Sequence, residues 1–415
     1  MRNFLLPLVT AGLALAARAE SLSPLAQRPN WQELEAFQET ITRAEFVRLL
    51  DRVYAPRDAH RGLIEVRETS ASILTHLGGN EYFVLRFAAE EKSAKPAPRF
   101  WHRRAELPQG KPLAGLRIAL DPGHLGGDWA RMEERWFTFD GGVPVAEGDL
   151  TLRVAELLAP KLTALGAEVL WVRRSAGPTT AQRPADFFPL ARTLLAAQGH
   201  AHPRETYRSM EEPGRGDTVQ AQAEFLFYRQ AEIRNRATIV NTELKPDVVL
   251  CLHFNADAWG NPDRPALVPN NHFHVLVNGA YSAGELRLDD QRFEMLQHLL
   301  GGITEEEQRL GTIVAQSMAS ALALPPFIYH QNNAVRVNGS PYVWARNLLA
   351  NRLYRCPVVF LEPYVMNSRE IWERVQAGDY ADERIVAGSL RPSLVREYAD
   401  AVANAFALPS VGTSP

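Results

Sequence analysis

After Leu113 the chain alternates short apolar runs with amphipathic segments of helical periodicity, and this alternation restricts the fold more than any other feature. The expected strands are 116–120, 167–172, 247–253, 273–277 and 357–361, and the expected helices are 149–165, 232–242 and 303–323. Such an order favours an α/β fold with a mostly parallel, twisted sheet flanked by helices. Pro160, inside the first of these helices, predicts a kink or a break.

The segment before Leu113 has a different character. Residues 31–54 carry helical periodicity, and 64–67 and 82–87 alternate like strands. We therefore expect a small α+β accessory domain with its linker over 20–108. The main domain is expected over 109–415, with insertions at 128–146 and 175–230, because long segments that do not fit a compact strand–helix unit are often loops over a site.

Residues 1–19 are typical of a signal peptide. Arg2 precedes an apolar run that ends near Ala17, and Ala17-Arg18-Ala19 has the small residues of a cleavage site before Glu20. We expect an exported protein that acts in the periplasm or outside the cell; the alternative is an uncleaved amphipathic N-terminus. The apolar run is shorter than a bilayer span, so no integral membrane segment is expected in the mature chain.

Charge and cysteine content exclude several classes of protein. Lysine and arginine total 45, aspartate and glutamate total 48, and the net charge is −3, which argues against a nucleic-acid-binding face. Cys251 and Cys356 are the two cysteines, so a disulfide framework and a four-cysteine zinc site are excluded. A single disulfide between them is left open, as is a role for Cys251 as a small buried hydrophobic residue.

Four polar residues lie where an expected strand ends or a helix begins: His124, Glu147, His253 and Glu362. Side chains at the carboxyl ends of parallel strands face a common crevice. Two imidazoles and one carboxylate leave an open fourth position on zinc, and a second carboxylate can take a proton from water. Each residue alone is more often a turn former, a helix cap or a core residue, so the prediction depends on all four occurring in order.

The ordered set resembles the zinc-dependent N-acetylmuramoyl-L-alanine amidases that cut bacterial cell wall. Four short blocks between Leu116 and Ala407 carry the resemblance: Asp121-Pro122-Gly123-His124-Leu125-Gly126-Gly127, Ala146-Glu147-Gly148-Asp149-Leu150, Leu252-His253-Phe254-Asn255-Ala256 after Arg234 to Asn241, and Pro357-Val358-Val359-Phe360-Leu361-Glu362 with Asn367 and Ser368. The chain departs from the family at Leu125 and Pro363 and in the long insertion between Val172 and Tyr228.

The resemblance implies one zinc ion per chain, held by His124, Glu147 and His253, with Glu362 as the catalytic base. It implies hydrolysis of the amide bond between N-acetylmuramic acid and L-alanine, and peptidoglycan as the partner. The alternatives are a zinc hydrolase of another envelope peptide or amide bond, and a cell-wall-binding protein that keeps the fold without the chemistry. An activator or regulator protein is left open.

Further residues are candidates for substrate contact or for the lining of the cleft. Asn255, Arg336 and Asn338 are the candidates for substrate binding. His272 and His274 share one face of an expected strand, and we expect a partly exposed strand facing the cleft rather than a second metal site, because a third ligand is lacking.

Overall fold

The computed structural model describes residues 21–408, so the expected signal peptide lies outside the described residues. The described chain divides into two compact units. The smaller unit contains 21–98, 183–230 and 280–301, and the larger contains 99–182, 231–279 and 302–408. None of the described helices is both long and apolar enough to cross a membrane.

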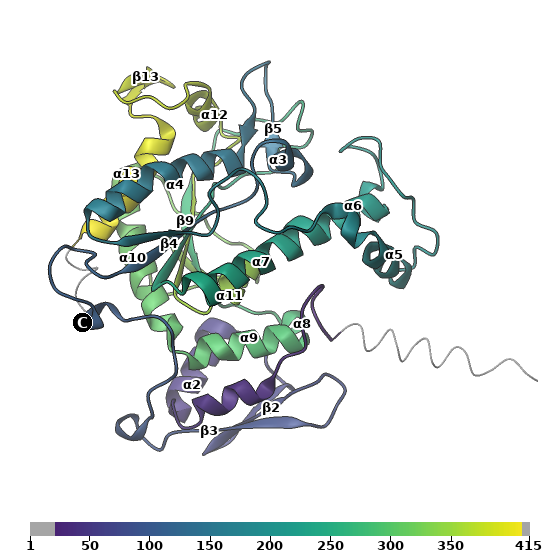
Figure 1. The fold of residues 1–415 in the computed structure, drawn as a ribbon, viewed down its shortest axis with the longest axis vertical. Helices are drawn as coiled ribbons and strands as arrows, with labels where there is room; N and C mark the ends of the chain where they lie inside the picture. The colour runs from purple at the N-terminus through teal and green to yellow at the C-terminus, as the bar shows by residue number, and fades with distance from the viewer. Residues whose placement is uncertain (1–20, 409–415) are drawn as a thin grey trace, which may run out of the picture. The chain divides into compact units, whose positions relative to one another are not determined.

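The larger unit is built on a seven-stranded sheet in the order β10-β11-β9-β12-β8-β4-β7 (Figure 1). The strands are β4 (Arg117–Pro122), β7 (Glu168–Trp171), β8 (Val248–Leu252), β9 (Phe273–Val277), β10 (Val335–Arg336), β11 (Val343–Ala345) and β12 (Val358–Pro363). Within the run β12-β8-β4-β7 each neighbouring pair is parallel, whereas β9 pairs antiparallel with β12. The predicted α/β class with a mostly parallel sheet is confirmed.

Helices cover both faces of this sheet. One face packs against α4 (Glu147–Ala164) and α10 (Ile303–Leu322), and α13 (Leu394–Ala407) packs beside both helices (Figure 1). The other face packs against α7 (Glu232–Thr238) and the helical turn Ile239–Leu244 that continues it, and α11 (Leu349–Leu353) contacts α7. The central strands are therefore apolar on both sides, as the continuous apolar runs in the sequence indicate.

The break that Pro160 could cause is not found: α4 runs from Glu147 through Pro160 to Ala164. Proline removes one backbone donor, but four side chains of α4, Val154, Ala155, Leu158 and Leu162, are buried on either side of it. Burial of this face stabilises the continuous helix.

The smaller unit contains a three-stranded antiparallel sheet, β1-β2-β3, and several helices, in agreement with the predicted α+β fold of the N-terminal segment. Its strands are β1 (Ile64–Val66), β2 (Ser70–Leu74) and β3 (Tyr82–Arg86), and its α-helices are α2 (Arg43–Leu49), α5 (Phe188–Ala197), α6 (Val219–Phe225), α8 (Ala283–Leu286) and α9 (Asp289–Leu300). Two details differ from expectation. Strand β2 was not predicted, and the helical stretch 31–54 is divided into Trp31–Phe37 and the segment from Arg43 onward.

The segment 128–146 belongs to the larger unit and has its own local structure. It contains the short helix α3 (Asp128–Met132) and the two-stranded ribbon of β5 (Trp136–Phe137) and β6 (Val145–Ala146). Glu133 and Arg135 lie between α3 and β5. The ribbon pairs Trp136 with Ala146, and the backbone N–H of Glu147, the first residue of α4, donates to the carbonyl of Arg135 at 3.1 Å. The segment therefore brings side chains to the same place as the first residue of α4.

Candidate metal centre

Three of the four predicted residues meet in the larger unit. His124 follows β4, Glu147 is the first residue of α4, and His253 follows β8. One potential ligand atom from each lies within 4.8 Å of the others. The Nε2 atom of His124 is 3.4 Å from Glu147 Oε2, and Nδ1 of His253 is 3.1 Å from Glu147 Oε1. Among the described residues this is the one group of three histidine, cysteine or acidic side chains that could hold a metal ion.

The turn after β4 is shaped to bring the two imidazoles together. A Cβ atom on Gly123 would overlap the His253 ring, so only glycine fits between the strand and that ring. His124 itself has a left-handed backbone with φ of 57°, which costs energy for a residue other than glycine. A Cβ on Gly148 would overlap the backbone of Leu125, so glycine also lets α4 approach this turn closely.

Glu133 fixes the orientation of His124. Its carboxylate lies 2.7 Å from Nδ1 of His124, and its second oxygen accepts a 2.6 Å hydrogen bond from the backbone N–H of Leu125. Glu133 is buried. A carboxylate on one ring nitrogen holds the proton there and leaves the other nitrogen, Nε2, as a metal ligand. No sequence pattern marked Glu133, because it lies in a segment without periodicity.

Glu147 is held in the charged form by its neighbours. Burial would raise the pKa of this carboxyl, but the His124 and His253 imidazoles and Arg135 lower it. The backbone N–H of Phe254 donates a 3.1 Å hydrogen bond to Glu147 Oε1, and Nε of Arg135 lies 3.5 Å from Oε2. A buried, ionised carboxylate between two imidazoles is a strong site for a cation.

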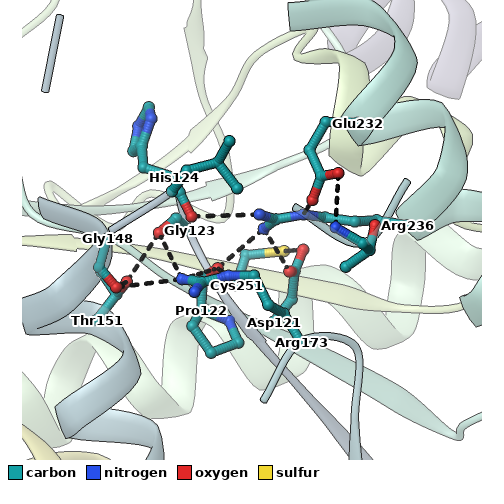
Figure 2. A network of polar contacts seen from close by, with 12 residues as sticks. Asp121, Pro122, Gly123, His124, Gly148, Thr151, Arg173, Glu232, Arg236 and Cys251 are labelled. Atoms are coloured by element: carbon teal, nitrogen blue, oxygen red, sulfur yellow. Dashed lines mark hydrogen bonds and ion pairs between the residues drawn. The ribbon is translucent and has the colours of Figure 1, made fainter. Parts of the chain in front are cut away.

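A buried polar network lies beneath the turn and holds its carbonyl groups (Figure 2). Arg236 of α7 forms an ion pair with Asp121 at 2.9 Å and also donates to the carbonyls of Pro122 and His124. Arg173 donates to the carbonyls of Pro122, Gly123 and Gly148. Both guanidinium groups are buried. They satisfy the carbonyl groups of the irregular turn, so the backbone that carries His124 is fixed from below.

Glu362 lies beside this centre. It follows Leu361, which pairs with Leu252 across the parallel strands β12 and β8. Glu362, the second-last residue of β12, therefore matches His253, which directly follows β8. The His253 ring stacks on Phe360 at 4.2 Å between centroids. Burial and the charge of Glu147 raise the pKa of Glu362 well above its ordinary value. Glu362 is partly buried.

The three candidate substrate residues are not gathered at one place. Asn255 lies two residues after His253, and its amide nitrogen is 3.5 Å from Nδ1 of His272. Arg336 lies on the edge strand β10, with its exposed guanidinium over the Trp344 ring. Asn338 is exposed in the following turn and donates to Thr312. Of the three, only Asn255 is near a predicted ligand in the sequence, two residues after His253.

The remaining candidates differ in part from expectation. His272 and His274 are both buried rather than partly exposed, because Phe327 and Tyr329 pack against their rings. Cys251 and Cys356 are buried free thiols, so the disulfide that the sequence left open is not formed. Burial raises the pKa of both thiols, which makes them unreactive core residues.

Comparison with protein-family models gives no match, and comparison with curated proteins gives no relative. Among solved structures, the chain is similar to the N-acetylmuramyl-L-alanine amidase Ami1 from Mycobacterium smegmatis, with 16% identity, coverage of 72% of this chain and 98% of that chain, and a TM-score of 0.38. It is also similar to the N-acetylmuramoyl-L-alanine amidase AmiC2 of Nostoc punctiforme, with 12% identity, 71% and 96% coverage and a TM-score of 0.36. A third is the CwlD amidase from Clostridioides difficile in complex with the GerS lipoprotein, with 10% identity, 70% and 94% coverage and a TM-score of 0.38.

Proposed function

We propose that this protein is an exported, zinc-dependent N-acetylmuramoyl-L-alanine amidase. The observation that carries the proposal is the meeting of His124, Glu147 and His253 within 4.8 Å, with Glu362 at the end of the neighbouring strand. The resemblance of the four sequence blocks to the cell-wall amidases supports the same reading. The substrate is then the amide bond between the lactyl group of N-acetylmuramic acid and L-alanine in peptidoglycan.

The donor set suits zinc. Two imidazoles and one carboxylate are ligands that zinc prefers, and three protein ligands leave a position open for water or substrate. The side chains of His124 and His253 are each 13% exposed, so the group is accessible from solvent. The carboxylate of Glu133 on Nδ1 of His124 is the partner that a zinc-binding histidine commonly has. We therefore expect one zinc ion per chain.

The chain's own residues divide the chemistry between them. Bound zinc supplies a Lewis acid that polarises a carbonyl group and lowers the pKa of water. Glu362 takes a proton from the attacking water and returns it to the nitrogen of the leaving amine. Burial and the charge of Glu147 raise the pKa of Glu362, which suits a group that accepts and releases a proton near neutral pH. Asn255, two residues after His253, Arg336 and Asn338 are the proposed contacts to substrate.

The experiment is an assay of residues 20–415, loaded with zinc, on purified peptidoglycan. A new L-alanine amino terminus in the products is the expected result, and a chelator should abolish its formation. Any other new terminus would favour a zinc hydrolase of a different envelope amide bond. Binding without any cleavage would favour a cell-wall-binding protein.

Glu362→Gln tests the role of the base. Glutamine keeps the size of the side chain but cannot accept a proton, so the rate should fall by about 10²–10⁴-fold while zinc content is unchanged. Zinc content is measured by mass spectrometry of the native protein. Loss of zinc from this variant would make Glu362 a ligand, and full activity would place the base elsewhere.

A further inference from the structure

A chain of three polar side chains lies beside Glu362 and is not explained by the proposed chemistry: His274 is buried, and Tyr329 and Arg346 are half-buried. Nη1 of Arg346 donates to the hydroxyl oxygen of Tyr329 at 3.1 Å, and this hydroxyl lies 3.1 Å from Nε2 of His274. Phe327 and Trp344 pack around Tyr329 and leave His274 buried at 3% exposure. His274 is on β9, two residues after His272.

The hydrogen bonds determine which nitrogen of His274 carries the proton. Arginine can only donate, so the Tyr329 oxygen accepts from Arg346 and its own O–H is free to donate. His274 Nε2 is the acceptor within reach of that hydroxyl. Burial, His272 and Arg346 lower the pKa of His274 to about 3, so the ring is neutral and has one proton. With the Tyr329 hydroxyl as the donor to Nε2, that proton is on Nδ1.

The Nδ1–H group of His274 is a buried donor without an acceptor. Nδ1 has no hydrogen-bond partner among the residues that the structure describes. In the antiparallel pair of β12 and β9, His274 is directly opposite Glu362, so the two side chains are on the same face of the sheet. Directly opposed residues have Cβ atoms about 4.5–5.5 Å apart. The sheet therefore makes His274, with its unused donor, and Glu362 neighbours on one face.

We propose that His274 is a positioning residue whose Nδ1–H donates to the Glu362 carboxylate during the reaction, with Tyr329 and Arg346 fixing the tautomer. The inference rests on the proposed function of Glu362 as the base. A buried polar group without a partner is costly, and a hydrogen bond to an ionised carboxylate is stronger than one between neutral groups. A hydrogen bond from Nδ1–H to the Glu362 carboxylate removes the free-energy cost of the unpaired donor and holds the base in position.

The kinetic test compares three substitutions of His274. Phenylalanine keeps the ring and removes the donor, asparagine puts an N–H near the place of Nδ1–H, and glutamine puts it nearer the place of Nε2. His274→Phe should lower kcat on peptidoglycan by about 10- to 100-fold with KM and zinc content unchanged. His274→Asn should recover most of kcat, whereas His274→Gln should not. Equal losses in all three variants, or unchanged kcat in His274→Phe, would overturn the proposal.

A second measurement does not depend on activity. Nitrogen-15 NMR of the histidine rings should show His274 as the neutral Nδ1–H tautomer, with a proton resonance that moves when Glu362 is changed to Gln. An Nε2–H tautomer, or a resonance insensitive to Glu362→Gln, would contradict the inference. If the wild-type protein does not cut peptidoglycan, the proposed function fails, and these spectra still decide whether His274 contacts Glu362.

Discussion

His124 depends on one neighbouring side chain for its orientation, and this dependence can be measured. Glu133→Ala removes the carboxylate that lies 2.7 Å from Nδ1 and frees the ring to rotate or change tautomer. We expect zinc affinity to fall by about 10- to 100-fold, the usual effect of losing such a partner. Competition with a chromogenic chelator measures the affinity.

Asp128→Ala is the matched control for this prediction. Asp128 is an exposed carboxylate on α3 in the same segment, and it is the first residue of that helix. Its removal should leave zinc affinity unchanged. Equal affinity of the Glu133→Ala variant and the wild type would show that the turn after β4 orients His124 without Glu133.

The residues found from sequence and those missed differ in a physical way. His124, Glu147, His253 and Glu362 each occupy the end of a strand or the start of a helix, and these ends are visible as changes in hydrophobic pattern. Glu133 and Arg135 contact the same centre from a segment without such a pattern. Their position depends on the path of 128–146, which a single sequence does not specify.

At the scale of secondary structure, Glu307 of α10 joins two strands of the sheet. Its carboxylate accepts hydrogen bonds from the backbone N–H groups of Val358 at 3.0 Å and Asn278 at 3.3 Å. Burial nevertheless raises its pKa to about 8. A pKa raised in the folded state contributes stability that is complete below pH 4.5 and is lost as the pH rises through about 8.

We therefore expect the free energy of unfolding to fall between about pH 5 and pH 8, with Glu307 contributing up to about 1.4 kcal/mol per pH unit. Glu307→Gln cannot ionise and should reduce that slope. Urea denaturation at a series of pH values measures it, with the exposed neighbour Glu305→Gln as control. Identical slopes in the wild type and Glu307→Gln would show that Glu307 does not titrate in this range.

Pro160 gives a prediction about α4. Because the helix continues through it, the ring removes a backbone hydrogen bond at an exposed position. Pro160→Ala should restore that bond and raise the free energy of unfolding by about 1–3 kcal/mol. Thermal or urea unfolding measures the change. A variant no more stable than the wild type would mean that the helix is already adapted to proline.

Elements covered on both faces were predictable, and those held by distant contacts were not. Strand β9 was predicted with its observed bounds, and β8 and β12 to within two residues, because their apolar runs are continuous. Strand β2 is only five residues long, and its pairing with both β1 and β3 determines it. Similarly, α4 continues through Pro160 because tertiary burial outweighs the local preference.

At the scale of the whole molecule, the two compact units do not follow the order of the chain. The smaller unit combines the N-terminal segment with residues 183–230 and 280–301. In the sequence, each of these two segments lies between parts of the larger unit. Composition marks the change near residue 113, but it contains no information on which distant segments pack together. The sheet and the candidate metal centre are both within the larger unit, so the proposed chemistry is assigned to that unit.

The last prediction concerns zinc as a stabilising ligand of the folded chain. The imidazoles of His124 and His253 balance part of the charge of buried Glu147. A bound cation balances more of it, and only the folded chain brings the three ligands together. Free zinc at 100 times its dissociation constant should therefore raise the free energy of unfolding by about 2.7 kcal/mol.

His253→Ala removes one ligand, so the same zinc concentration should give little or no increase. His253 also stacks on Phe360, so the variant is less stable even without zinc, and the quantity to compare is the zinc-dependent increase. His330→Ala, a change at an exposed histidine, should keep the full increase. An increase in His253→Ala as large as in the wild type would remove His253 from the metal centre.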